Sequence, residues 1–234
     1  MVKFQASAMN HLYSRLESSG FLRTSQPLSS PVVIHAVAGA GKTRLIQSLL
    51  SDFPGLFSVS SVANNIVNSL THGSSVSVPA GAIRILDEYQ SGSSVEGFEV
   101  LLGDPLQAPP SERSFFPHFV KDSTERFGSS SCALLRFLGI SVFSDKVDSL
   151  VIRSPFGFSP TDPCFALDQE GFDYLVAHSI TPLRFCEIVG QTFDSLVVLA
   201  SNRLATYPKH ILYIAFSRHR YKLTFLTPYA SNRA

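Results

Sequence analysis

Short apolar runs alternate with amphipathic stretches along this chain, and each change of pattern predicts a change of element. The spacing of apolar residues over 6–19 predicts a first helix. The uninterrupted, β-branched run at 32–37 indicates a strand buried on both faces of a parallel sheet. A second helical stripe follows over 43–53. A strand that leads through a glycine-rich turn into a helix is half of a βαβ unit, so an α/β fold is predicted.

Further apolar runs continue this pattern to the end of the chain. We expect strands at 56–62, 82–86, 99–103, 196–199 and 223–226, and helices at 131–139 and 211–218. The proline-rich stretch at 105–117 is the best candidate for a boundary between two halves. The chain is therefore predicted to contain an N-terminal helix (1–24), a first domain (25–112) and a second domain (113–234).

Composition narrows the class of protein without indicating a partner. An apolar share of 44% is enough for a core, and no apolar run approaches the roughly 18 residues of a membrane span. The N-terminus also lacks the apolar core of a signal peptide. The net charge is only +1, so a basic surface for a polyanion would have to be created locally by the fold. Three widely spaced cysteines argue against a disulfide framework or a zinc site, and together these features indicate a soluble intracellular protein.

The strongest chemical signal is the glycine-rich segment Gly39-Ala40-Gly41-Lys42-Thr43. It follows the phosphate-loop pattern GxxxxGK[ST], except that Ala36 replaces the first glycine. Gly39 and Gly41 allow the backbone N–H groups to face inward, and the following helix N-terminus adds its positive end. In such a loop Lys42 reaches the β- and γ-phosphates, and the Thr43 hydroxyl coordinates Mg²⁺. The alternative is a plain strand-to-helix turn, and the buried strand before it and the amphipathic helix after it count against that alternative.

Acidic and amide side chains follow two of the next apolar runs. Asp87 ends the run at 82–86, where a Walker B aspartate holds Mg²⁺, and Glu88 is a candidate general base for a water molecule. Gln107 follows the run at 99–103, where it could contact the γ-phosphate or the attacking water. Taken alone, each of these segments reads as a turn. Because a phosphate loop lies upstream, we interpret these segments as parts of a nucleotide site. Glu88 favours hydrolysis by water over transfer of the phosphoryl group to another acceptor.

AGAGKT, LDEY and GDPLQAP resemble, in this order, motifs I, II and III of superfamily 1 helicases. The form HAVAGAGKT is more closely similar to the helicase-type first movement protein of the triple gene block of filamentous plant RNA viruses (the potexvirus, carlavirus and allexivirus group). Residues 124–128 resemble motif IV, 189–194 motif V and 215–220 motif VI. The resemblance covers about residues 21–227, and it implies two compact RecA-like P-loop NTPase halves with parallel sheets.

When the roles of the family's motif residues are assigned to the matching positions of this chain, the resemblance implies a site for ATP, or another nucleoside triphosphate, and Mg²⁺. The implied nucleotide-binding residues are Gly39, Ala40, Gly41, Lys42, Thr43 and Asp87, of which Thr43 and Asp87 hold the metal. The implied catalytic residues are Glu88, Gln107 and two arginine fingers from the second half, Arg126 and Arg218, with Arg220 as an alternative to Arg218. The residues implied to couple RNA contact to the nucleotide cleft are Gly190, Gln191 and Thr192.

The resemblance further implies an RNA-binding NTPase or helicase in the host cytoplasm that acts in movement of viral RNA through plasmodesmata and in suppression of RNA silencing. Implied partners are single-stranded viral RNA, coat protein, companion movement proteins, host silencing factors and other copies of the chain. Strong processive unwinding is not expected, because the chain shows no tryptophan and no evident basic–aromatic cluster for stacking bases. The alternative function is a nucleotide-switched RNA-binding scaffold. A small-molecule kinase is disfavoured by Glu88 and GDPLQ.

Overall fold

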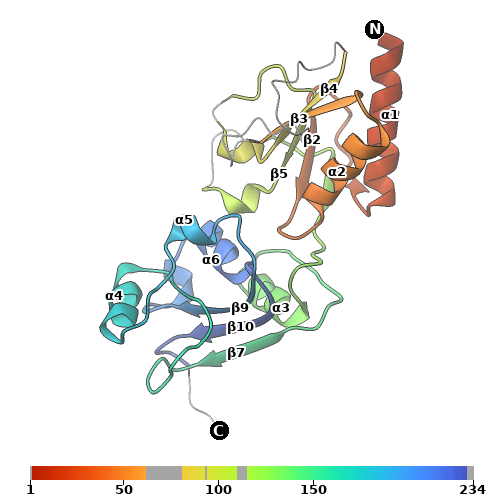
Figure 1. The fold of residues 1–234 in the computed structure, drawn as a ribbon. Helices are drawn as coiled ribbons and strands as arrows, with labels where there is room; N and C mark the ends of the chain where they lie inside the picture. The colour runs from red at the N-terminus through yellow and green to blue at the C-terminus, as the bar shows by residue number, and fades with distance from the viewer. Residues whose placement is uncertain (1, 62–80, 93, 110–114, 231–234) are drawn as a thin grey trace. The chain divides into compact units, whose positions relative to one another are not determined.

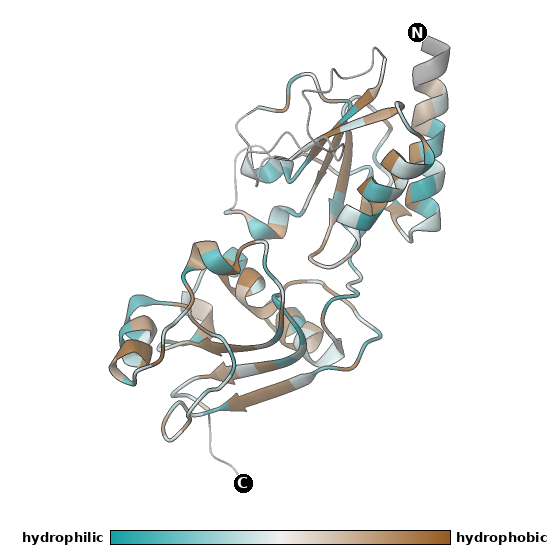
Figure 2. Cartoon of the chain, in the orientation of Figure 1, coloured by the Kyte–Doolittle hydropathy of each residue, from teal (hydrophilic) through white to brown (hydrophobic). Residues whose placement is uncertain are grey.

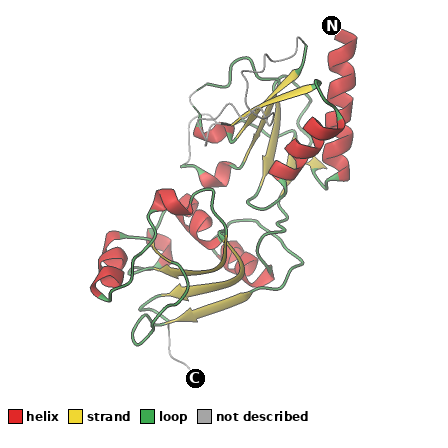
Figure 3. Ribbon diagram, viewed as in Figure 1, coloured by secondary structure: helices red, strands yellow, loops and turns green. Residues whose placement is uncertain are grey.

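Two mostly parallel β-sheets, one in each half of the chain, organise the fold (Figure 1). The structure is a computed structural model that describes residues 2–61, 81–92, 94–109 and 115–230. It divides into two compact units, Met1–Asp122 and Ser123–Ala234. Helices and parallel strands alternate in both units (Figure 3), which confirms the expected α/β class with parallel sheets.

The first unit extends further along the chain than the proline-rich stretch suggests. The boundary expected after residue 112 lies outside the described residues. Beyond it, β6 (Phe119–Lys121) pairs in parallel with β2 (Val32–Ala36) and antiparallel with β1 (Leu22–Arg23). These ladders tie β6 to the first sheet, so the second unit begins only at Ser123.

In the described residues, the first sheet places five parallel strands side by side, next to the antiparallel β1. Its order is β1-β6-β2-β5-β4-β3, where the remaining strands are β5 (Val100–Gly103), β4 (Ile83–Asp87) and β3 (Phe57–Ser61). His35 pairs with Gly103, and Asp87 pairs with Leu102, so β2, β5 and β4 end at nearly the same level. Because these strands are parallel, the loops that follow them leave the sheet at one edge, where α/β proteins bind their ligands.

The described part of the first unit also contains two helices and two 3-10 turns. Their bounds are α1 (Val2–Ser18), α2 (Lys42–Asp52), η1 (Tyr89–Ser91) and η2 (Pro105–Gln107). The apolar stripe of α1 buries Leu12 and Leu16, and that of α2 buries Leu45 and Leu49, as the helical spacing predicts. The turns η1 and η2 follow β4 and β5 directly, so they lie at the same sheet edge as the start of α2.

The second sheet is entirely parallel and has the order β7-β10-β9-β8. Its strands are β7 (Ser149–Arg153), β10 (His219–Leu226), β9 (Phe193–Leu199) and β8 (Cys164–Ala166). The other elements are α3 (Ser129–Phe137), α4 (Gln169–Ala177), α5 (Phe185–Ile188), the 3-10 turn η3 (Leu204–Thr206) and α6 (Lys209–Phe216). Over the described ranges, no helix combines the length and the apolar character needed to span a bilayer.

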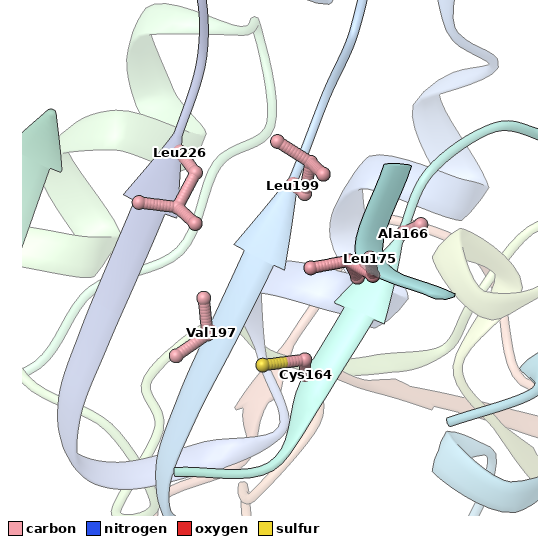
Figure 4. Close-up of a cluster of buried hydrophobic side chains, with 6 residues drawn as sticks. All are labelled: Cys164, Ala166, Leu175, Val197, Leu199 and Leu226. Atoms are coloured by element: carbon pink, nitrogen blue, oxygen red, sulfur yellow. The ribbon is translucent and has the colours of Figure 1, made fainter. Parts of the chain in front are cut away.

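Apolar residues concentrate on the strands of the second unit, as the brown colour of β7, β9 and β10 in Figure 2 shows. Figure 4 shows one buried cluster, which joins β8, β9, β10 and α4 through Cys164, Ala166, Leu175, Val197, Leu199 and Leu226. The burial of these side chains in one cluster removes apolar area from water, and it therefore holds the sheet and α4 together.

Two features of the second unit differ from the expectation. The helix expected over 211–218 is α6, which ends at Phe216, so Arg218 lies in the turn before β10 rather than in a helix. The segment 140–185, which shows no diagnostic pattern, contains β7, β8 and α4. Four of the five residues of β7 are exposed, and it is an edge strand, so the alternation that marks a half-buried strand is missing there.

Candidate functional site

A glycine turn with left-handed backbone joins β2 to α2. Gly39 has a φ of 77° and Gly41 a φ of 93°, which glycine adopts without the steric cost of a Cβ atom. The N–H of Ala40 donates to the carbonyl of Val37 at 3.1 Å and closes the turn. Gly41 is the N-cap of α2, and no side chain among the described residues caps this helix end. The turn thus places the N–H groups and the positive end of α2 at the edge where β4 and β5 also end.

The ammonium group of Lys42 is held inside this turn. Nζ donates to the carbonyls of Ala36 at 2.7 Å and Val37 at 3.2 Å, and it lies 4.0 Å from Oδ2 of Asp104. Only 12% of the Lys42 side chain and 1% of the Asp104 side chain are exposed. Because little water screens this pair, its attraction is stronger than that of a surface ion pair. The start of α2 therefore carries a positive charge in a partly desolvated position.

Asp87 and Glu88 lie at the carboxyl end of β4. Burial, and after it the negative charge of Glu88, raise the pKa of Asp87 to about 6, while the positive charge of Lys42 opposes the rise. The N–H of Glu88 donates to Oδ1 of Asp87 at 3.0 Å, and Glu88 itself has a φ of 55°. Such a backbone conformation costs a non-glycine residue about 1–2 kcal/mol. A carboxyl group with a raised pKa beside a strained residue is typical of a functional site.

Asp104 is a candidate site residue that the sequence interpretation missed. It directly follows β5, it is buried, and its carboxylate accepts hydrogen bonds from the N–H of Leu106 at 3.3 Å and from Nε2 of Gln107 at 2.8 Å. Asp104 thereby positions Gln107 and faces Lys42 at the same time. Its signal in the sequence is an aspartate between a buried strand and a proline, which on its own predicts only a turn.

A hydrogen-bonded aromatic pair supports the same edge. Nε2 of His35 lies 2.5 Å from the hydroxyl of Tyr89, and burial lowers the pKa of His35 to about 4, so the ring is neutral at pH 7. Tyr89 and Gln90 pack so closely on Gly103 that an added Cβ there would lie 2.2 Å from Oε1 of Gln90. His35 is thus a largely buried histidine with a hydrogen-bond partner, and close packing explains the glycine at 103.

The first unit brings the predicted nucleotide-site residues of the first half to one sheet edge. These are the glycine-rich turn, Thr43 in the first turn of α2, Asp87 with Glu88, and Gln107. In the part of the chain that the structure describes, no three His, Cys, Asp or Glu side chains are grouped to hold a metal ion. A magnesium ion that accompanies a nucleotide takes one or two protein ligands together with phosphate oxygens. The oxygen donors of Thr43 and Asp87 fit that requirement.

The predicted residues of the second half meet within the second unit. Nη1 of Arg126 donates to the carbonyl of Ser217 at 3.3 Å, so Arg126 contacts the turn that carries Arg218. The carbonyl of Arg218 in turn accepts the N–H of Phe193 at 2.7 Å. Phe193 directly follows Gly190-Gln191-Thr192, so the turn that carries Arg218 adjoins both of the other predicted segments of this half.

The two alternative finger arginines have different surroundings. Arg218 is only 2% exposed and lies in the turn between α6 and β10. The side chain of Arg220 is 54% exposed, and its Nη1 lies 3.2 Å from Oδ1 of Asp194. Exposed ion pairs of this kind contribute about 0–1 kcal/mol. Arg218 is therefore confined by burial, whereas Arg220 is exposed and has a weak ion pair.

Arginine–aromatic pairs lie where the strands of the second sheet end. The guanidinium of Arg153 lies 4.6 Å from the ring centre of Phe158, and that of Arg203 lies 5.6 Å from the ring centre of Tyr229. The N–H of Thr227 donates to the carbonyl of Arg153 at 3.0 Å, which joins the ends of β7 and β10. The sequence shows no evident basic–aromatic cluster because Arg203 and Tyr229 are far apart in the chain and only the fold brings them together.

A family model described as the viral superfamily 1 RNA helicase core domain matches residues 32–227. The chain belongs to the viral superfamily 1 RNA helicase family. The match begins at β2 and ends directly after β10, so it includes the glycine-rich turn of the first unit and the three adjoining segments of the second unit.

Curated members of this helicase family that are named movement and silencing protein TGBp1 are similar over nearly the whole chain. The protein of Indian citrus ringspot virus is 36% identical, over 91% of this chain and 94% of that protein. The protein of Chrysanthemum virus B is 35% identical, over 92% and 95%, and that of Papaya mosaic potexvirus is 34% identical, over 94% and 96%. These relatives confirm the resemblance to the triple gene block proteins.

A solved helicase structure has a similar fold. The complex of arterivirus non-structural protein 10 (helicase) with DNA matches with a TM-score of 0.51 at 13% identity, over 94% of this chain. This chain spans 58% of the length of that helicase. At 13% identity this similarity shows a shared fold alone.

Gly41→Ala is expected to lose nucleotide binding as well as stability. The φ of 93° strains any Cβ by about 1–2 kcal/mol, although no heavy atom lies within 4 Å of the added atom. Gly55→Ala is the matched control, because Gly55 has a φ of 81°, equally open surroundings and a position outside the site. We expect similar decreases in Tm for both variants, and a loss of affinity for a fluorescent ATP analogue of about tenfold or more for Gly41→Ala alone. An equal loss of affinity in both variants would contradict a phosphate-binding role of the turn.

Proposed function

We propose that this chain is a Mg²⁺-dependent, RNA-stimulated NTPase that acts in cell-to-cell movement of viral RNA and in suppression of host RNA silencing. The observation that carries the proposal is the meeting of Lys42, Asp87 and Asp104 at one sheet edge, beside an uncapped helix N-terminus. Membership of the helicase family and the names of the TGBp1 relatives support it.

A nucleoside triphosphate, ATP among others, would lie on the turn between β2 and α2. The N–H groups of the turn and the ammonium of Lys42 would bind the β- and γ-phosphates. Lys42 would exchange its two bonds to the carbonyls of Ala36 and Val37 for bonds to phosphate oxygens. Thr43 and Asp87 would hold Mg²⁺, which when bound neutralises charge that develops on the phosphates.

The ionisation of Asp87 and metal binding are linked. With a pKa of about 6, Asp87 is mostly ionised at pH 7 and becomes protonated as the pH falls below 6. A cation favours the ionised carboxylate, so a bound Mg²⁺ would lower the pKa of Asp87. We therefore propose that Asp87 serves as a metal ligand rather than as a proton donor at neutral pH.

Hydrolysis needs a positioned water and positive charge around the transferring phosphoryl group. Glu88 would orient or deprotonate the water, and Gln107, which Asp104 positions, would contact that water or the γ-phosphate. Arg126 and Arg218, or Arg220 in place of Arg218, would supply the positive charge. Hydrolysis of the nucleotide, rather than processive strand separation, is the activity that this set of residues supports.

Single-stranded RNA is the proposed partner, and the pairs Arg153–Phe158 and Arg203–Tyr229 support it. Proteins bind single strands without sequence preference through aromatic rings on which bases stack, next to arginines that contact the backbone. Tyr229 is 55% exposed, so a face of its ring is accessible to a base. The adjoining segment Gly190-Gln191-Thr192 would couple RNA contact to the nucleotide site.

The cellular part of the proposal rests on the relatives that are named movement and silencing proteins. We propose that the chain acts at plasmodesmata in the host cytoplasm. Proposed protein partners are coat protein, companion movement proteins, host silencing factors and further copies of the chain.

Glu88→Gln tests the enzymatic function and separates it from a scaffold function. Removal of the carboxylate that orients water is expected to lower RNA-stimulated ATP hydrolysis by about 100-fold or more, while ATP still binds. Glu96→Gln, an exposed glutamate later in the same inter-strand segment, is the matched control and keeps hydrolysis. Phosphate release is the measurement, followed by assays of viral movement and silencing suppression in plants. Full hydrolysis by Glu88→Gln would refute the catalytic assignment, and full movement without hydrolysis would favour the scaffold.

Tyr229→Ala is expected to weaken binding of single-stranded RNA by about 5- to 100-fold, because loss of one stacked base costs about 1–3 kcal/mol. Tyr221→Ala is the matched control, since Tyr221 is 65% exposed and lies in β10 away from its carboxyl end. Fluorescence anisotropy with a labelled oligonucleotide at fixed salt measures both affinities. Equal affinities of the two variants would exclude the strand ends of the second sheet as an RNA-binding surface.

A further inference from the structure

Asp148 lies outside all six motifs, yet it holds the start of α3. It directly precedes β7, and its Oδ1 accepts the N–H of Ser130 at 2.9 Å while its Oδ2 accepts the N–H of Ser131 at 3.3 Å. The N-cap of α3 is Gly128, which has no side chain to satisfy these N–H groups. The carboxylate of a residue 20 positions away in the chain therefore caps the helix that follows motif IV.

The same carboxylate holds the histidine of motif VI. Nε2 of His219 lies 3.0 Å from Oδ2 of Asp148 and 3.0 Å from Oγ of Ser131, and the side chains of His219 and Asp148 are fully buried. Because a carboxylate only accepts hydrogen bonds, Nε2 must carry the hydrogen. His219 directly follows Arg218, so this bond fixes the backbone next to the proposed finger.

Motif IV also contacts Asp148 and the backbone close to His219. Gly128 packs so closely that an added Cβ would lie 2.4 Å from the backbone nitrogen of Asp148. Two residues earlier, Arg126 donates to the carbonyl of Ser217, which lies two residues before His219. Asp148 thus touches both segments from which a finger arginine is proposed to extend.

The carboxylate of Asp148 is ionised in the folded chain. Burial by itself raises the pKa of Asp148, but the hydrogen bonds from His219, Ser131 and the backbone of Gly128 outweigh burial, so the pKa lies below its usual range. A buried carboxylate with this many donors holds them in a defined geometry, since each lost bond would leave an unsatisfied polar group.

We propose that Asp148 is a positioning residue for NTP hydrolysis: it holds motif IV and motif VI in register through His219 and the start of α3, and thereby sets the positions of Arg126 and Arg218. The inference rests on the proposed function of these two arginines. Misplacement of a catalytic group by about 1 Å can lower a rate by about 100-fold. If Asp148 no longer holds the two motifs in position, we expect kcat to fall without a matching change in nucleotide affinity, because the proposed nucleotide site lies in the first unit.

The test compares Asp148→Asn with Asp168→Asn. Asp168 is a matched control because it also caps a helix of the second unit, α4, by accepting the N–H of Gly171 at 2.7 Å. It further accepts hydrogen bonds from Ser201 and Tyr207, and these partners lie outside the motifs. Both substitutions keep the size of the side chain and remove its charge, so both are expected to lower the Tm of the full chain.

We expect Asp148→Asn to lower kcat of RNA-stimulated ATP hydrolysis by about 10- to 100-fold at a temperature where both variants are folded. Its affinities for nucleotide and RNA are expected to stay within about twofold of the unsubstituted chain, and Asp168→Asn is expected to keep its kcat. Equal kcat values for the two variants would overturn the inference.

A second pair of variants covers the case in which Asp148→Asn does not fold. His219→Gln keeps an N–H donor for Asp148 and is expected to retain several-fold more kcat than His219→Ala, and equal kcat values would overturn the inference. The proposed function is judged separately, by hydrolysis in the unsubstituted chain and its loss in Lys42→Ala. Hydrolysis that requires Lys42 but is unaffected by Asp148→Asn would refute the positioning role alone.

Discussion

The parallel alignment of β2, β5 and β4 is the constraint on which the proposed nucleotide site depends. Their registers place the loop with Lys42, the carboxyl group of Asp87 and the carboxyl group of Asp104 at the same level of one sheet edge. Three segments that are distant in the chain thereby share one electrostatic environment: Lys42 opposes the rise of the Asp87 pKa and faces Asp104 at 4.0 Å. A slip of β5 by one residue would turn its side chains to the opposite face and separate Asp104 from Lys42.

The second unit is organised by buried hydrogen bonds between loops rather than by a glycine turn. Arg126 and Ser217 are 91 positions apart, yet one hydrogen bond joins them, and the carboxylate of Asp148 connects the same two regions through His219. Apolar packing places the strands, but it does not orient an arginine. Buried polar networks have that capacity, because each member has few alternative partners once water is excluded.

A structural feature could be predicted from the sequence where neighbouring residues encode it, and could not where it depends on contacts between residues that are distant in the chain. The turn at Gly39–Thr43 was predictable because its backbone conformation and its charge are encoded within five neighbouring residues. The role of Asp104 could not be predicted, because only the pairing of β5 with β2 brings its carboxylate close to Lys42. The end of α6 at Phe216 was also missed, because Ser217 and Arg218 fit a last helical turn as well as a loop, and neither is a Gly or Pro that marks a helix end. The contacts of Asp148 and of Arg203 with distant residues exist only in the folded chain.

Amide hydrogen exchange of the full chain, with and without Mg²⁺ and a non-hydrolysable ATP analogue, reports whether the carboxyl edge of the first sheet binds the triphosphate. We expect slower exchange in peptides that contain residues 37–43, 87–90 and 104–107, which lie at the carboxyl edge of the first sheet. We expect unchanged exchange in peptides at the opposite ends of β2 and β5, around residues 28–32 and 99–100. Protection at those opposite ends, or no protection at the carboxyl edge under saturating nucleotide, would contradict the claim that this edge binds the triphosphate.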